Sequence, residues 1–221
     1  PENYIKIIDR SGFFEVTSFS DDDINRNAMY KANAQRVKVS KKFENYDDYL
    51  LSLEMTAEIE EFKSIDLQRI TQLTNKSNQF NLTTKRYTQN EIEKISSDGN
   101  YITLCGRLKD KFGDNGIVSV IIGRKENDIL HIDLWLMSCR VLKRNMEYAM
   151  LDCLVSEAKL HGIRNIYGYY LKTKKNNMVK SLFSDFGFEK ISEDIEENTV
   201  WEMDIKNYIP KNNLITVKQT Q

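Results

Sequence analysis

From residue 55 onward, the hydrophobic positions switch repeatedly between the two-residue spacing of strands and the three-to-four-residue spacing of helices. Strands are predicted over 55–62, 101–108, 117–122, 129–137, 166–171, 189–195 and 199–205, and helices over 65–73, 89–95, 146–160 and 177–186. Ser64 and Thr88 are expected to cap the first two helices, with Ile65 on the apolar face of the first, and Gly187 is expected to end the fourth. A turn-rich loop is predicted over 109–115. Helices that alternate with strands in this order surround a mixed sheet, here with an antiparallel meander in its middle. The pattern therefore predicts an α/β fold of the α+β type.

The segment before residue 55 has a different pattern. Helices are predicted over 2–10, 21–39 and 46–53, but too few apolar residues fall there to form a separate core. Asp21-Asp-Asp23 contains a D-x-D, which carries the nucleophile in some phosphatases. No hydrophobic strand precedes it, so acids in a first helical turn capped by Ser20 are favoured. We expect a helical appendage over 1–53 and a domain over 54–207. A loose polar tail is expected over 208–221.

The strand over 129–137 leads into the amphipathic helix over 146–160 through a basic turn. A strand that turns into a helix directs free backbone N–H groups and the positive end of the helix dipole at the turn, which favours anions. Cys139 lies in this turn with Arg140, Lys143 and Arg144. The stretch is interpreted as a place where a phosphate-bearing arm meets a cysteine.

Composition narrows the classes of protein. A net charge of -1 argues against a general nucleic-acid binder, and the basic run over 140–180 by itself is typical of a solvated surface. The three cysteines form no C-x-x-C pair, so neither a disulfide framework nor a zinc site is indicated, and a reducing cytoplasm fits. No apolar run is long enough for a membrane span, and no signal peptide is recognisable. The sequence begins with Pro1, and we expect it to be a piece of a longer protein.

The polar segment over 75–87 has two interpretations. It carries many hydrogen-bonding side chains, and as such it is either a solvated loop or a substrate-facing one. It lacks Gly and Pro, while Phe80, Leu82 and Tyr87 can anchor it. The substrate-facing interpretation is slightly favoured.

Two sets of residues resemble known families. The order of elements and the stretch over 176–188 are similar to the GNAT acyltransferase fold, with Asn176, Val179, Leu182-Phe183 and Gly187-Phe188 on the matching positions. The resemblance implies a mixed central sheet flanked by helices, with a splay between the strands over 129–137 and 166–171.

Three further strings resemble the C-terminal half of FkbH-like proteins. They are the segment over 67–87, which includes Asn78-Gln-Phe-Asn-Leu-Thr-Thr84, then Phe112-Gly-Asp-Asn-Gly116, then Trp135-Leu-Met-Ser-Cys-Arg-Val-Leu142. That family joins a HAD-type phosphatase domain to a GNAT-like domain. It loads a glyceryl unit from a phosphorylated glycerate onto the phosphopantetheine thiol of an acyl carrier protein through an enzyme thioester.

The resemblance also implies cofactors and partners. The partners are an acyl carrier protein and phosphorylated glycerate, with no nucleic acid and no membrane. No cofactor is expected to be bound within this chain; it would meet the carrier's phosphopantetheine, with CoA as the other option. No metal site is expected here, because magnesium belongs to the HAD domain, whose motifs are absent from this sequence.

Two departures from the family pattern weaken the case for ordinary acetyl-CoA binding. Lys143-Arg144-Asn145 stands where the family usually has Gly-Arg-Gly, and the loss of two glycines restricts how closely the backbone wraps a pyrophosphate. Phe183 stands where GNAT enzymes often have a tyrosine that acts as an acid. Weak or no acetyl-CoA binding is therefore predicted.

A thioester mechanism needs a thiolate and donors for the oxyanion. Cys139 is the favoured nucleophile, against the alternative of a small buried apolar residue, and Cys105 and Cys153 are assigned to packing. His131 and Asp133 share a strand face and are candidates for a base or orienting group near Cys139. For His131 a plain strand residue is favoured, and Asp133 has the alternative of pairing with a basic neighbour.

Two sets of binding residues complete the hypothesis. The candidate substrate contacts are Asn78, Gln79, Asn81, Thr83, Thr84 and Arg86. The candidate contacts to phosphopantetheine or CoA are Arg140, Val141, Lys143, Arg144, Asn145 and Asn176. A docking surface for an acidic carrier is predicted from Arg140, Lys143, Arg144, Lys172, Lys174 and Lys175. Three functions stay open: glyceryl transfer, docking of the carrier for the missing phosphatase domain, and CoA-dependent N-acetylation.

Overall fold

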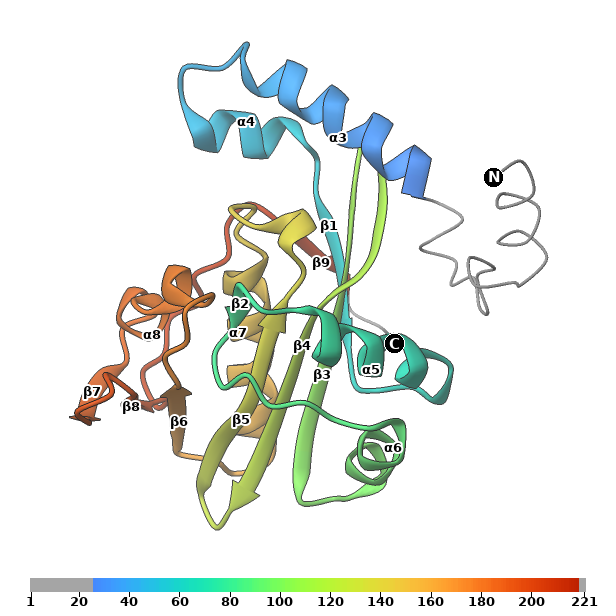
Figure 1. The fold of residues 1–221 in the computed structure, drawn as a ribbon. Coiled ribbons are helices and arrows are strands. Elements are labelled where there is room, and N and C mark those ends of the chain that lie inside the picture. Colours follow the sequence, from blue (N-terminus) through green and yellow to red (C-terminus); the bar gives the residue numbers. More distant parts are fainter. Residues whose placement is uncertain (1–25, 219–221) are drawn as a thin grey trace, which may run out of the picture.

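The computed structural model describes residues 26–218, and Figure 1 shows their arrangement around one large sheet. Two helices come first, α3 (Arg26–Ser40) and α4 (Tyr46–Ser52). The helix predicted over 2–10, the cap at Ser20 and the D-x-D over 21–23 lie outside the described residues.

The later elements follow the predicted alternation closely. The strands are β1 (Thr56–Glu60), β2 (Phe80–Asn81), β3 (Tyr101–Asp110), β4 (Gly113–Glu126), β5 (Ile129–Met137), β6 (Asn165–Tyr170), β7 (Glu189–Glu193), β8 (Thr199–Asp204) and β9 (Thr216–Lys218). The helices are α5 (Leu67–Lys76), α6 (Gln89–Ser97), α7 (Met146–Leu160) and α8 (Leu182–Asp185), and the short 3-10 turns are η1 (Ser64–Asp66), η2 (Cys139–Val141) and η3 (Asn177–Val179).

The sheet has the strand order β7-β8-β6-β5-β4-β3-β1-β9, and β3, β4 and β5 form the predicted antiparallel meander. β5 and β6 are parallel, but they pair only at their beginnings, from Ile129–Asn165 to His131–Tyr167. The two strands then separate. This is the splay that the resemblance implies.

The space between the separating strands is filled by the chain itself. β2 pairs with the end of β5, placing Phe80 opposite Met137. Beyond β2, the backbone N–H of Leu82 donates to the carbonyl of Trp135 at 3.1 Å, and the carbonyl of Leu82 accepts from the N–H of Leu171 at 2.8 Å. Leu82 therefore connects β5 on one side of the splay to Leu171, which follows β6, on the other.

Helices cover both faces of the sheet (Figure 1). α7 packs on one face in the larger core cluster, and α5 and α6 pack on the other in a smaller one. Gly106 in β3 permits the close approach of α7, because a Cβ there would lie 2.5 Å from atoms of Met146 and Met150. Tyr49 and Leu50 of α4 join the larger cluster, so α4 packs into the core of the domain that follows it.

Several predicted boundaries agree with the structure. β5 and α7 have the predicted limits, and Thr88 caps α6 in a capping box with Glu91. Gly187 follows α8 with a positive φ of 81°, as a residue that ends a helix commonly does.

Four predictions about local structure were wrong. Ser64 provides no cap, and Ile65, predicted on the buried face, lies in a 3-10 turn and is 87% exposed. The predicted loop over 109–115 is mostly paired strand, because β3 and β4 extend to a tight turn. The helix predicted over 177–186 splits into η3 and α8.

The fourth error concerns the tail. Residues 208–218 do not form a loose tail, because Asp152 accepts hydrogen bonds from Tyr208, Lys211 and Asn212, and β9 pairs with β1. Within residues 26–218, no helix is both long and apolar enough to span a membrane.

Candidate functional site

The cysteine predicted as nucleophile lies directly after the end of β5. Ser138 caps η2, and Cys139 is the first residue of that turn, with its side chain exposed. The other two cysteines differ: burial raises the pKa of Cys105 to about 12 and of Cys153 to about 11. Both are poor nucleophiles at neutral pH, which fits the packing role predicted for them.

Cys139 opens into a cavity of about 540 Å³. Its lining includes the segment from Met137, the last residue of β5, to Arg140, and also Phe80 of β2. A volume of this size suits a small ligand together with part of an extended arm.

Two helices contribute to the walls of the cavity. α5 contributes Arg69, Leu73 and Lys76, and α3 contributes Met29, Tyr30, Asn33 and Arg36. Within each set the residues recur three, four and seven positions apart, so each set occupies one helical face. Neither wall was predicted from the sequence. The residues of each helix do recur at helical spacing, but nothing in the sequence shows that the two helical faces line one cavity.

The lining is strongly basic. Its cationic side chains are Arg36, Arg69, Lys76, Arg140 and Arg144, and none of the described lining residues is acidic. Guanidinium groups bind phosphate and carboxylate through paired N–H donors. The cavity therefore favours an anionic ligand next to Cys139.

Two residues of the basic turn adopt a backbone conformation that glycine favours. Lys143 and Asn145 are both left-handed, with φ of 63° and 61°. For Lys143 this conformation costs about 1–2 kcal/mol, whereas Asn adopts it more readily. The weak binding of a pyrophosphate by this turn stays a prediction.

Arg144, predicted to be exposed at the mouth of the site, is buried. Its side chain is 8% exposed, and it donates to Asp110 at 3.1 Å and to the carbonyl of Arg140 at 2.9 Å. Val141 is also buried, in the larger core cluster. Lys143 is exposed, and its backbone carbonyl accepts from Tyr46 of α4 at 2.8 Å.

His131 and Asp133 are absent from the cavity lining that includes Cys139. Asp133 lies in the middle of β5, four residues before the end of the strand, about 13 Å at the rise of a strand. Asp133 instead pairs with Lys85 at 3.1 Å and Arg124 at 3.4 Å, the alternative considered for it.

His131 is held in the same distant cluster. Its Nδ1 lies 2.7 Å from the hydroxyl of Tyr169, and its Nε2 lies 3.4 Å from Glu126. Burial, followed by the charge of Arg124, lowers the pKa of His131. His131 is therefore more buried than the exposed strand residue that was favoured, and its side-chain contacts are with residues outside the cavity lining.

The predicted substrate contacts divide into two groups. Asn78 and Gln79 line the cavity. Asn81 and Thr83 are buried, with Asn81 accepting from the N–H of Thr84 and Thr83 donating to the carbonyl of Asp133 at 2.8 Å. These side chains hold β2 and its flanks in place and do not line the cavity.

Arg86 also stabilises the segment. It donates to the backbone carbonyls of Thr74 and Ser77 and to the side chain of Asn78. The guanidinium thereby fastens the loop that presents Asn78, and Arg86 itself is absent from the cavity lining.

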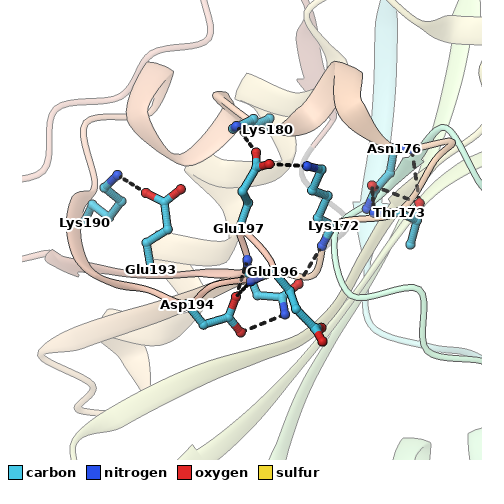
Figure 2. Close-up of polar contacts among 10 residues, drawn as sticks. Lys172, Thr173, Asn176, Lys180, Lys190, Glu193, Asp194, Glu196 and Glu197 are labelled. Atoms are coloured by element: carbon cyan, nitrogen blue, oxygen red, sulfur yellow. Dashed lines mark hydrogen bonds and ion pairs between the residues drawn. The ribbon is translucent and has the colours of Figure 1, made fainter.

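Asn176 closes the splay from the other side. Its Nδ2 donates to the carbonyls of Asn81 at 3.0 Å and Leu171 at 2.9 Å, and its Oδ1 accepts from the backbone and hydroxyl of Thr173 (Figure 2). The side chain is fully buried, with both donors and its acceptor used inside the chain. It is unavailable to phosphopantetheine, contrary to the prediction.

Phe183 is a core residue. It is fully buried, and its ring lies over Gly168, where a Cβ would come within 2.3 Å of it. Phe188 and Trp201 pack on the same ring. No acid can act from this position.

The predicted docking surface is smaller than expected. Figure 2 shows Glu197 between Lys172 and Lys180, and these two lysines lower the pKa of Glu197 to about 2. The charge of Lys172 is thereby compensated. Of the six predicted residues, the exposed ones are Lys143, Lys172, Lys174 and Lys175, and among these Lys172 is paired with Glu197.

One group of side chains in the described part of the chain has the spacing of metal ligands. Atoms of Glu61, Glu157 and His161 lie within 4.8 Å of one another. The group sits at the surface by the last turn of α7, which begins after the Cys139 turn and is about 22 Å long. Acidic surface groups of this kind often gather without an ion.

Searches for related proteins gave matches by fold alone. No family model matches the sequence, and no curated protein matches it. Similar solved structures include the ribosomal-protein-S18-alanine N-acetyltransferase from Escherichia coli, with 11% identity, a TM-score of 0.52, and coverage of 70% of this chain and 99% of that one.

Two further structures give the same result. A domain from Methanocaldococcus jannaschii has 16% identity and a TM-score of 0.53, with 68% of this chain and 99% of that one covered. Ard1 from Thermoplasma volcanium has 15% identity and a TM-score of 0.51, with 67% and 97% covered. The predicted GNAT acyltransferase fold is confirmed, and the chain contains a GNAT-like domain.

Proposed function

We propose that this GNAT-like domain transfers an acyl group through a thioester on Cys139. The donor is a phosphorylated glycerate and the acceptor is the phosphopantetheine thiol of an acyl carrier protein. The observation that carries the proposal is the position of Cys139, an exposed cysteine in a cavity lined by five cationic side chains, two of which pair with the buried Asp110. The resemblance to FkbH-like proteins supplies the identity of the acyl unit.

The reaction needs no other reactant when the phosphate is on the carboxyl group of glycerate, because the donor is then an acyl phosphate with its own leaving group. The thiolate forms an S–C bond to the acyl carbon, the C–O bond to phosphate breaks, and phosphate leaves with its electron pair. The carrier thiol then attacks the thioester, gives up its proton and releases the Cys139 thiolate. The lining guanidiniums stabilise both the leaving phosphate and the oxyanion.

A docking module without chemistry is the second candidate. The same basic cavity favours it, because an anionic arm would bind there even if Cys139 formed no adduct. The two candidates differ only in whether a covalent intermediate exists.

CoA-dependent N-acetylation is the third candidate, favoured by the fold of the neighbours. An extended pantetheine inserted between β5 and β6 would need the backbone groups that Phe80–Asn81 and Leu82 already use. Phe183 also lacks the hydroxyl of the tyrosine that would act as the acid. Both features argue against this candidate.

The test is intact mass after incubation with glycerate phosphorylated on its carboxyl group. A glyceryl adduct that carrier protein discharges, and that Cys139→Ser lacks, supports acyl transfer. Carrier binding without an adduct would favour the docking module. Acetylation of an amine at the expense of acetyl-CoA would favour the third candidate.

A further inference from the structure

A buried carboxylate lies behind the basic wall of the cavity. Asp110 ends β3, and its side chain is 0% exposed. It accepts two hydrogen bonds from Arg36 of α3, at 2.8 and 2.9 Å, one from Arg144 at 3.1 Å, and one from the backbone of Phe112 at 2.8 Å. One carboxylate thus joins the N-terminal helix to the turn after β5.

The connection continues to the nucleophile. Arg144 uses its Nη2 to donate to the carbonyl of Arg140 at 2.9 Å, and Arg140 directly follows Cys139 in η2. The contacts therefore run from α3 through Asp110 and Arg144 into the turn that presents the thiol.

The ion pairs of Asp110 with Arg36 and Arg144 are buried and well oriented. A bidentate arginine–carboxylate pair fixes orientation as well as distance. Arg36 and Arg144 are both buried, so removal of Asp110 would leave two guanidiniums facing each other without a counter-charge. Burial, with Arg36 next, already lowers the pKa of Arg144, and Asp110 opposes that shift.

We infer that Asp110 is a positioning residue for the Cys139 site, which holds α3 as a wall of the cavity and fixes the Cys139 turn in the same network. α3 then contributes directly to the structure of the site. The inference rests on the proposed function only in treating Cys139 as the reactive group.

The test uses Asp110→Asn in the full chain, with two measurements. The first is the pH dependence of Cys139 alkylation by iodoacetamide, and the second is hydrogen exchange of the α3 amides. We expect the alkylation midpoint to move to lower pH, because the wall loses a negative charge. Exchange in α3 should be roughly threefold or more faster.

Two comparisons separate positioning from a general loss of structure. Asp110→Glu keeps the charge and should restore the alkylation midpoint. Asp114→Asn, an exposed acid in the same hairpin, should change neither measurement. If Asp110→Asn does not fold, Arg36→Met keeps the Asp110–Arg144 pair and should speed exchange in α3 and alkylation of Cys139 by a bulky maleimide.

A wild-type alkylation midpoint and wild-type α3 exchange in Asp110→Asn would overturn the inference, as would unchanged values in Arg36→Met. Failure of the proposed function is a separate result. It would appear as no glyceryl adduct on the wild-type protein, or as an adduct that persists in Cys139→Ser, whatever the Asp110 variants do.

Discussion

The first half of β5 and its end carry ionisable side chains in different ways. In the first half of the strand, up to its middle, His131 and Asp133 pair with neighbouring side chains on the sheet surface. At the end, cations surround a cavity and the main carboxylate, Asp110, is buried behind them. The titratable groups on the strand itself therefore form ion pairs and hydrogen bonds with one another. The candidate site lies where the strand ends and a cavity opens beside the helices.

The largest expected effect sharpens this comparison. Cys139→Ser should lower the rate of adduct formation at least about a thousandfold, because the nucleophile is removed. Asp133→Asn, in the middle of β5, should stay within about twofold of wild type, because Asp133 does not line the cavity. Intact mass over time measures both. A large loss of adduct formation in Asp133→Asn would mean that the ion pairs of Asp133 also serve the site.

A large effect on stability is expected where the chain fills the splay. Asn176→Ala removes the donors of two buried carbonyls, and should lower the free energy of unfolding by about 2–4 kcal/mol. Thermal unfolding followed by circular dichroism measures it. The adjacent Asn177 is exposed, and Asn177→Ala serves as the matched control. Equal melting temperatures for Asn176→Ala and Asn177→Ala would show that the hydrogen bonds of Asn176 contribute little to stability.

A weaker effect concerns acetyl-CoA. Because β2 takes the free edge of β5, acetyl-CoA should bind with a Kd no tighter than about 1 mM, about -4 kcal/mol. Calorimetric titration tests this, with the carboxyl-phosphorylated glycerate as the comparison ligand on Cys139→Ser. Low-micromolar binding of acetyl-CoA would restore N-acetylation as the favoured function.

The smallest effect is a pH dependence at the beginning of β5. The folded state lowers the pKa of His131 below its usual 6.5, so the unfolded state takes up the proton first. Stability should fall as pH drops below about 6.5 and through the lower folded value, and His131→Gln should remove that part of the fall. Chemical denaturation between pH 7.5 and 5 measures it, with the exposed His161→Gln as control. Identical pH profiles for wild type and His131→Gln would contradict the assignment.

Much of the fold was predictable because periodicity reports local burial. The limits of β5 and α7 followed from their apolar spacing, and the alternation of elements indicated the mixed sheet. Periodicity failed at Ile65, because a 3-10 turn precedes α5. It also failed at β2, whose two residues are too few to show a period.

The site was predictable only in part. Cys139, Asn78 and Gln79 lie at one cavity, as the resemblance suggested. The polar side chains of Asn81 and Asn176 suggested ligand contacts, but they satisfy buried backbone groups instead. Arg36 and Asp110 are 74 positions apart, and nothing in the sequence links them before the chain is folded.

The pairing of β9 with β1 has a consequence for handling the protein. Without β9, β1 would be the last strand of the sheet, with a row of backbone groups open to solvent. Open strand edges recruit strands from other molecules. β9 blocks this edge, and its Lys218 adds a charge there through a 3.1 Å pair with Glu58. β9 thereby protects β1 from edge-to-edge aggregation, and a protein shortened after Pro210 would be prone to self-association.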